Sequence, residues 1–495
     1  MSGPPIHREQ VLGLEIADSG RLALLGFSAS QQTSVGKSMK QAIIGGSVGL
    51  VSGGLVLALL FAGPLSLGSD TQELAVTQSP VVTQSQEPIS ESVTVSESVE
   101  VAPVTCSVSE FENSDQILDL QAQVIDAATG NVLFDRSSEV ATRPASVLKL
   151  FTAAAALETL GPDYRVTTRV FQDAADPSIL YLVGAGDVTL SRTGVNQASV
   201  YRGAPKLSDL ARQIASRTGA QTFSQIVLDS TTYGKAQGEY LTAWDQRGLT
   251  DGYMSYVSAL QVDGDRTNPG QTDSPRSKDP VQRAGVWFQE AIGQNAASAT
   301  LIKGAVPSSA IEIAKVQSAP ISTWIDYMLV VSDNTLAEAL GRLISLDVGL
   351  SGSFDSLTSA YTRALRGTGL NLTGMKVEDA SGLSRFNQVS PAQVNELLKL
   401  IDQGYGDFEL ITEGMPVSGT PGSLSARFED AVGFVTAKTG WIRTGYTLAG
   451  FLDLKDRGRL IFTVYNLGDV TVENREAMDE LVMGFYDCGL NLVDR

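Results

Sequence analysis

The sequence predicts a mixed α/β protein whose main sheet is completed by strands from both ends of the folded region. Near its start, two apolar runs within residues 118–136 flank the turn-forming residues 127–131, a pattern typical of a β-hairpin. Residues 447–468 repeat that hairpin pattern, and a helical pattern follows at 472–489. Helical patterns also occur between the two hairpins. Strands at both ends with helices between them indicate a single α/β core.

This core is predicted to comprise residues 111–163 and 319–495. The segment between them, residues 164–318, contains short apolar runs separated by Gly, Pro, Asp and Asn, which punctuate turns. We interpret it as an inserted domain.

Composition excludes several classes of function. The 495-residue chain has a formal net charge of −19, which argues against nucleic acid as a partner. Its single histidine, His7, precedes the folded region, so that region can contain neither a Ser-His-Asp triad nor a histidine-ligated zinc site. Two cysteines are too few for a thiolate metal cage, and we expect no metal or other cofactor. Any serine chemistry must therefore use a base other than imidazole.

The N-terminal region is predicted to anchor the protein in a membrane. Residues 1–40 form a polar leader with basic residues, and residues 42–62 carry no charge. As a helix, this apolar stretch would span roughly 31 Å, which matches a bilayer core of about 30 Å. Basic residues precede it, and none follows until Arg136, so the leader is expected to be cytoplasmic and the rest extracytoplasmic. A cleaved signal peptide, giving a secreted protein, or a buried core helix are the alternatives.

A polar segment follows the predicted membrane span. Residues 69–110 are rich in Ser, Thr, Val, Gln and Glu and contain few large side chains. Such a composition buries too little apolar surface to order a chain, so we predict a flexible tether.

The first of three short motifs is Ser-x-x-Lys at the start of a predicted helix, in "RPASVLKLFTAAAALETLG", residues 143–161. Because residues three apart share a helix face, Lys149 can reach the hydroxyl of Ser146. A buried lysine loses pKa by desolvation and can act as a base near neutral pH. By itself, the pattern is better explained by a helix-capping serine followed by a lysine that extends to solvent.

The second motif is Ser332-Asp333-Asn334, which lies between two helical patterns. In an interhelical turn, Ser332 could relay a proton and Asn334 could hold a substrate amide. An ordinary capping turn explains the same residues when they are considered alone.

The third motif is Lys438-Thr439-Gly440 in the strand-like run "VGFVTAKTGWI". At a strand edge, these residues would offer a cation and a hydroxyl to a carboxylate, and Gly440 would allow close backbone approach. A plain strand that ends in a turn is the alternative.

The combination of the three motifs is more specific than any one of them. Ser-x-x-Lys, Ser-x-Asn and Lys-Thr-Gly occur in this order after the predicted membrane span. The same trio marks class A β-lactamases and penicillin-binding proteins, in which no histidine is needed at the nucleophile. The combination therefore predicts that Ser146 is a nucleophile.

From about Asp119 to the C-terminus, the sequence resembles the D-alanyl-D-alanine carboxypeptidase/endopeptidase family of class C low-molecular-mass penicillin-binding proteins. The segments "LYLVGAGDVTL", "DASGLSR" and "MPVSGTPGSLSARF" carry this likeness in addition to the motifs. The resemblance implies a core like that of serine β-lactamases and transpeptidases, an antiparallel sheet with helices on both faces. It also implies hydrolysis of the terminal D-Ala-D-Ala bond of peptidoglycan stem peptides, with acylation of the same serine by β-lactams.

The resemblance further implies a role for each motif residue. Ser146 would be acylated, Lys149 would activate it, and Ser332 would assist protonation of the leaving group. Substrate would be bound by Asn334 and by the Lys-Thr-Gly motif, with the terminal carboxylate on Lys438 and Thr439.

The implied oxyanion hole consists of the backbone N–H groups of Ser146 and Trp441. The family usually carries a small hydroxyl residue where this chain has Trp441, which leaves a backbone donor but makes the pocket rim bulkier. Asp379, Ser381 and Gly382 match a family segment, for which we expect a structural role.

The two cysteines bracket the folded region, and the hairpins at its two ends are expected to be neighbours in one sheet. Both cysteines lie outside the cytoplasm on the predicted topology. A disulfide between Cys106 and Cys488 is therefore expected.

Two other functions share these motifs. A serine β-lactamase would deacylate rapidly, but no Glu-x-x-Leu-Asn segment lies between Asn334 and Lys438. A catalytically quiet wall-binding module would be labelled by penicillin without releasing D-Ala. Both remain alternatives to a D-Ala-D-Ala carboxypeptidase, and the residues do not separate carboxypeptidase from endopeptidase activity.

Overall fold

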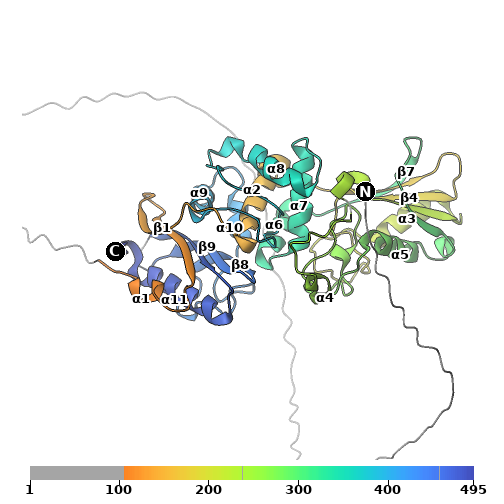
Figure 1. The fold of residues 1–495 in the computed structure, drawn as a ribbon. Coiled ribbons are helices and arrows are strands. Elements are labelled where there is room, and N and C mark those ends of the chain that lie inside the picture. The colour runs from red at the N-terminus through yellow and green to blue at the C-terminus, as the bar shows by residue number, and fades with distance from the viewer. Residues whose placement is uncertain (1–104, 237, 456–457, 495) are drawn as a thin grey trace, which may run out of the picture. The chain divides into compact units, whose positions relative to one another are not determined.

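The computed structural model describes residues 105–236, 238–455 and 458–494, all of which belong to one compact unit (Figure 1). Its helices and strands arrange around two separate five-stranded sheets. The predicted cytoplasmic leader and membrane span, residues 1–40 and 42–62, lie outside the described residues. Within the described part of the chain, no helix is long and apolar enough to cross a membrane.

The first sheet joins the two ends of the folded region, as the two hairpin patterns predicted. Its strand order is β2-β1-β10-β9-β8, and every neighbouring pair is antiparallel. Strand β1 pairs with β10 along its whole length, from Asp119 opposite Leu467 to Asp126 opposite Leu460. The strands are β1 (Asp119–Asp126), β2 (Val132–Arg136), β8 (Val435–Ile442), β9 (Gly445–Asp453) and β10 (Arg459–Leu467).

Helices cover both faces of this sheet, which confirms the predicted core architecture. Successive strand residues point to opposite faces, so Phe462 packs in one apolar cluster and Ile461 in another. Figure 1 shows helix α9 (Pro391–Asp402) on one side of the sheet and helix α11 (Val472–Cys488) on the other. Strand β8 forms one edge of the sheet.

Helix α2 (Leu148–Leu160) occupies the centre of the helical layer. It is buried without interruption from Leu148 to Leu157, because its sequence is apolar on all sides apart from Lys149 and Thr152. Four consecutive alanines, residues 153–156, allow neighbouring helices to approach closely. The helices in contact with it are α6 (Ile321–Val330), α7 (Asn334–Asp347), α8 (Leu357–Ala364) and α10 (Glu409–Gly414).

The second sheet lies within residues 167–317, in the segment interpreted from the sequence as an insertion. Its order is β6-β5-β4-β3-β7; β4, β5 and β6 run parallel, whereas β3 is antiparallel to both of its neighbours. Helices α3 and α5 pack with it around an apolar cluster of its own. The elements are β3 (Thr167–Gln172), β4 (Ile179–Val183), α3 (Leu207–Thr218), β5 (Gln225–Asp229), α4 (Arg247–Asp251), α5 (Pro280–Ile292), β6 (Thr300–Lys303) and β7 (Ile311–Gln317).

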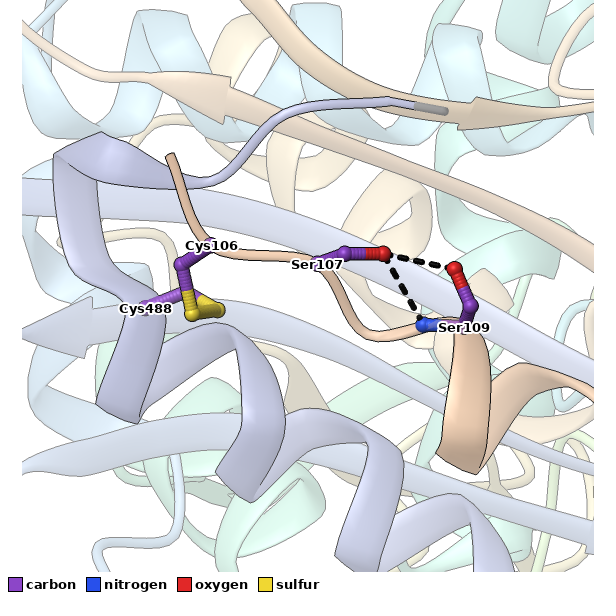
Figure 2. The surroundings of a disulfide bond; sticks show 4 residues. All are labelled: Cys106, Ser107, Ser109 and Cys488. Atoms are coloured by element: carbon purple, nitrogen blue, oxygen red, sulfur yellow. Dashed lines mark hydrogen bonds between the residues drawn. A yellow bond between two sulfur atoms is a disulfide. The ribbon is translucent and has the colours of Figure 1, made fainter. Parts of the chain in front are cut away.

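A disulfide joins the two ends of the folded region. Cys106 is bonded to Cys488 at the end of α11, with their Cα atoms 5.3 Å apart (Figure 2). Beside the bond, the hydroxyl of Ser107 accepts a hydrogen bond from the backbone N–H of Ser109, where helix α1 (Ser109–Glu112) begins. The bond closes a loop of 382 positions, and such long closures restrict the unfolded chain most strongly.

The same region corrects the predicted boundary of the tether. The composition predicts a flexible segment over residues 69–110, but within it Cys106 forms the disulfide and also a parallel bridge with Leu492. Composition alone did not reveal this order, because the segment is held by the disulfide, by backbone hydrogen bonds of Cys106 with Asn491 and Val493, and by burial of the single side chain of Val108. The rest of the tether, residues 69–104, lies outside the described residues.

Candidate active site

Ser146 lies in a tight turn that is held against the edge of the first sheet. It belongs to a 3₁₀ turn, Ala145–Val147, that leads directly into α2. The preceding Pro144 accepts a hydrogen bond through its carbonyl from the Thr447 hydroxyl at 2.8 Å, and Arg143 Nε donates to the Thr444 carbonyl at 2.7 Å. The turn is thereby fixed to the β8–β9 hairpin, which places the Ser146 hydroxyl at the sheet edge.

Lys149 lies beside Ser146, as the spacing predicted. Its Nζ is 2.9 Å from Ser146 Oγ, and it donates to Asn334 Oδ1 at 2.7 Å and to the Ser381 carbonyl at 2.6 Å. The side chain is 0% exposed. Burial lowers the pKa of Lys149 to about 8, although the carboxylates of Asp379, Asp333 and Glu338 act in the opposite direction.

The second and third motifs meet each other next to this pair. Lys438 Nζ donates to Ser332 Oγ at 3.0 Å and to the Thr439 carbonyl at 2.8 Å. Burial, with the nearby charge of Lys149, holds the pKa of Lys438 well below its usual value. The structure therefore brings all three motifs together, although Ser146 and Ser332 lie 186 positions apart in the chain (332 − 146).

The side chain of Asn334 is engaged at both ends within the protein. Its oxygen accepts from Lys149, and its Nδ2 donates to the Tyr253 carbonyl at 3.0 Å. A backbone carbonyl can only accept, so this contact with Tyr253 fixes which end of the amide faces the lysine. Beyond the substrate contact expected from the sequence, Asn334 thus orients the lysine.

Strand β8 lies at the edge of the sheet beside Ser146, and residues 416–418 pair with only the first part of that edge. On that edge, Ala437 N–H donates to the Pro416 carbonyl at 2.9 Å. N–H groups alternate between the two edges of a strand, so the N–H groups of Thr439 and Trp441 face the same side as that of Ala437. A Cβ on Gly440 would lie 2.9 Å from Ser146 N, so only glycine permits this approach.

Sequence reasoning missed one group that supports the lysine. Glu338 lies four residues after Asn334, on the same face of α7. Its carboxylate accepts from the backbone N–H groups of Ala380 and Ser381 at 3.0 and 2.9 Å, and it pairs with Arg342 at 3.2 Å. Burial raises the pKa of Glu338 to about 7, and the charge of Asp379 adds to the rise. The helical spacing from Asn334 was the signal that could have identified it.

Asp379 organises the loop that carries the Ser381 carbonyl. It is buried and accepts hydrogen bonds from the Trp244 indole, from the backbone N–H groups of Gly382 and Ser384, and from the Asn387 amide. This is the structural role expected for the segment. Gly382 adopts φ +85°, and a Cβ there would lie 1.9 Å from the Ala145 carbonyl oxygen.

A cleft of about 1000 Å³ opens over these residues. The core and the segment 242–276 both line it, and the indole of Trp441 stands at its rim, 53% exposed, against the Tyr446 ring. The residues of the three motifs that line it are Ser146, Ser332, Asp333, Asn334, Thr439 and Gly440.

Fold and site together define a serine acyl-transfer enzyme of the penicillin-binding class, in which a lysine takes the place of histidine beside the nucleophile. The sequence matches the D-Ala-D-Ala carboxypeptidase 3 (S13) family over residues 113–274 and 267–484, and the chain belongs to that family. It is therefore a hydrolase of the D-Ala-D-Ala carboxypeptidase type, as the motifs predicted.

Individual relatives support this assignment. The chain is 30% identical to carboxypeptidase DacB of Mycolicibacterium smegmatis, covering 90% of this chain and 97% of that protein. It is 28% identical to a D-alanyl-D-alanine carboxypeptidase of an Actinomadura species, covering 70% and 77%. Penicillin-binding protein 4 of Haemophilus influenzae shares the fold, with a TM-score of 0.64 at 19% identity over 77% of this chain and 98% of that one.

The contact between Gly382 and the nucleophile turn makes a testable prediction. Gly382→Ala should slow covalent labelling of Ser146 by a fluorescent penicillin about 10²-fold, because the added Cβ displaces Ala145 and with it the nucleophile. Gly374→Ala is the matched control, since Gly374 has a similar φ of +78° and no heavy atom within 4 Å of its added Cβ. Equal labelling rates in the two variants would show that the contact at Gly382 has no part in positioning Ser146.

Proposed function

We propose that this chain hydrolyses the terminal D-Ala-D-Ala bond of peptidoglycan stem peptides through an acyl-enzyme on Ser146. The observation that carries the proposal is the buried Lys149 amine, 2.9 Å from the Ser146 hydroxyl and with a pKa of about 8. Relatives named as D-alanyl-D-alanine carboxypeptidases support the choice of substrate.

In the acylation step, neutral Lys149 accepts the proton of Ser146. A neutral amine has two N–H groups and one lone pair. The two N–H groups donate to Asn334 Oδ1 and to the Ser381 carbonyl, which can only accept. The lone pair is then directed to the Ser146 hydroxyl, which donates its proton as Oγ attacks the substrate carbonyl. At pH 7, a pKa of about 8 leaves roughly one lysine in ten neutral.

The developing oxyanion is stabilised by the backbone N–H groups of Ser146 and Trp441. Support comes from the edge geometry of β8, on which Ala437 and Trp441 direct their N–H groups to the same side, and from the close approach of Gly440 to Ser146. Since the donor at Trp441 is a backbone group, its unusual side chain does not remove it.

Ser332 delivers a proton to the leaving amine as the C–N bond breaks. Its hydroxyl is reprotonated by Lys438, which lies 3.0 Å away and has a lowered pKa. Lys438 and Thr439 also receive the terminal carboxylate of the substrate, whose negative charge favours the protonated form of the lysine. The proton held on Lys149 then returns to Lys438, so that Lys149 is neutral again. In deacylation, Lys149 takes a proton from the attacking water and delivers it to Ser146 Oγ as the ester bond breaks, which releases the acid product and restores the enzyme.

β-Lactams acylate the same serine, because they present an acyl carbonyl and a carboxylate to the same groups. A structure of penicillin-binding protein 4 of Haemophilus influenzae is complexed with a β-lactam. D,D-endopeptidase activity is a second candidate function, since both reactions proceed through the same acyl-enzyme and differ only in the amine that leaves.

Incubation of the purified extracytoplasmic part with a pentapeptide muropeptide and with a cross-linked dimer tests the proposal. Mass spectrometry should report loss of one D-Ala from the first substrate, and cleavage of the second if endopeptidase activity is present. Ser146→Ala should lower both rates by more than about 10³-fold. Penicillin labelling without D-Ala release would instead identify a quiet binding module, and rapid turnover of penicillin would identify a β-lactamase.

The protonation state of Lys149 makes a second prediction. Because only neutral Lys149 accepts the serine proton, the acylation rate should rise about tenfold for each pH unit below the pKa of about 8 and then level off. Glu338→Gln removes a negative charge that raises this pKa, so its midpoint should move to lower pH. Stopped-flow labelling with penicillin between about pH 6 and pH 9.5 measures both profiles; a flat profile would reject Lys149 as the base.

We further propose that residues 42–62 hold the enzyme in the cytoplasmic membrane and that the tether lets it reach peptidoglycan outside the cell. Support comes from the uncharged length of this stretch and the basic residues before it. The full chain should fractionate with membranes and a chain that lacks residues 1–68 with the soluble material. A full chain found in the soluble fraction with a shortened N-terminus would indicate signal cleavage instead.

A further inference from the structure

A buried ion pair ties the second motif to the inserted segment. Arg266 Nη2 and Asp333 Oδ2 are 2.6 Å apart, and their side chains are 1% and 2% exposed. Asp333 is the middle residue of Ser332-Asp333-Asn334, whereas Arg266 comes from the segment between β5 and α5. The pair therefore connects the turn between α6 and α7 of the core with the inserted segment.

Arg266 is itself held rigidly by the inserted segment. Its guanidinium donates to the Tyr201 hydroxyl at 2.6 Å and to the carbonyls of Asp263 and Thr272 at 3.2 and 3.0 Å. It also stacks over the Tyr201 ring, 4.8 Å from the centroid. Because these contacts fix the guanidinium, the Asp333 carboxylate can pair with it in only one position.

Asp333 is fixed from two sides. One carboxylate oxygen pairs with Arg266, and the other caps α7 by accepting from Leu336 N–H at 2.9 Å. The preceding Ser332 has φ +60°, a left-handed conformation that is unfavourable for a residue other than glycine. A strained residue persists only where its surroundings enforce it, and here the enforcing contacts lie on the very next residue.

We propose that Arg266 is a positioning residue for the proposed reaction. Through Asp333, it holds Ser332 in its strained conformation, in which Ser332 Oγ accepts a hydrogen bond from Lys438 Nζ. The inference rests on the proposed role of Ser332 as the proton donor to the leaving amine. The inserted segment thus completes the catalytic apparatus in addition to lining the cleft.

The test compares two substrates that transfer the same acyl group to Ser146. The first is a peptide that ends in D-Ala-D-Ala, whose leaving group is an amine, and the second is the corresponding thiolester, whose leaving group is a thiolate. An amine must be protonated to leave, whereas a thiolate leaves without a proton. A defect in Ser332 placement should therefore slow amide hydrolysis about 10²-fold and thiolester hydrolysis less than about tenfold. A general loss of structure would slow both substrates by the same factor.

Two variants remove the ion pair. Arg266→Met leaves Asp333 buried without its partner, so the double variant Arg266→Met/Asp333→Asn is made beside it, because asparagine keeps the oxygen that caps α7. Both variants should show the selective loss on the amide, and Arg266→Lys should restore part of it. Arg212→Met is the matched control, since it breaks the exposed pair of Arg212 with Asp209 on α3, and it should hydrolyse both substrates like the unmodified chain.

Ser332→Ala separates failure of this inference from failure of the proposed function. If Ser332→Ala loses both substrates equally, Ser332 is not the proton donor and the proposed mechanism is wrong at that step. If Ser332→Ala is selective for the amide but the folded double variant is not, Arg266 has no positioning role. Selective loss in both variants, with unchanged thermal unfolding of the double variant, supports the inference.

Discussion

The site depends on the burial of one amine without a carboxylate in direct contact. Lys149 is fully buried, and its three polar neighbours are a hydroxyl, an amide oxygen and a backbone carbonyl. A carboxylate within hydrogen-bonding distance would hold the ammonium and keep its pKa high. Instead, Glu338 acts through the backbone of residues 380 and 381, at one remove from the amine. The desolvation of Lys149 therefore exceeds the attraction of the nearby carboxylates, and its pKa falls to about 8.

Two glycines, Gly382 and Gly440, pack closely against opposite sides of the turn that carries Ser146. Ala145 has φ +46° and lies between Gly382 and Gly440, each of which would clash with the turn if it carried a Cβ. The loop that Gly382 belongs to also supplies the Ser381 carbonyl to Lys149, and the strand of Gly440 supplies the edge beside Ser146. Since one turn contacts both elements, small displacements of either would alter the base and the oxyanion site together.

Local patterns predicted the elements of the fold well, because hairpins and amphipathic or apolar helices leave signals within a few residues. The turn at residues 127–131, the helix that carries Ser146 and Lys149, and the edge strand with Lys438 could all be placed in this way. The meeting of the three motifs could not be derived from their spacing, because it is created by packing between distant segments; only the family resemblance implied it. Arg266 was missed for a related reason. In a segment rich in Gly, Pro, Asp and Asn, an arginine resembles a solvated loop charge, and only the tertiary structure buries it against Asp333.

Residues of the inserted segment form direct polar contacts with the Ser332–Asn334 loop of the core. Tyr253, from the inserted segment, accepts the Nδ2 proton of Asn334 and so leaves the amide oxygen for Lys149. Arg266, from the same segment, fixes the neighbouring Asp333. A core that lacked these two contacts would still contain Ser146 and Lys149 on one helical turn, but the Ser332–Asn334 loop would lose the groups that orient it. For this reason the inserted segment cannot be regarded as an independent module: it supplies the hydrogen bond to Asn334 and the ion pair with Asp333 that hold this loop of the core.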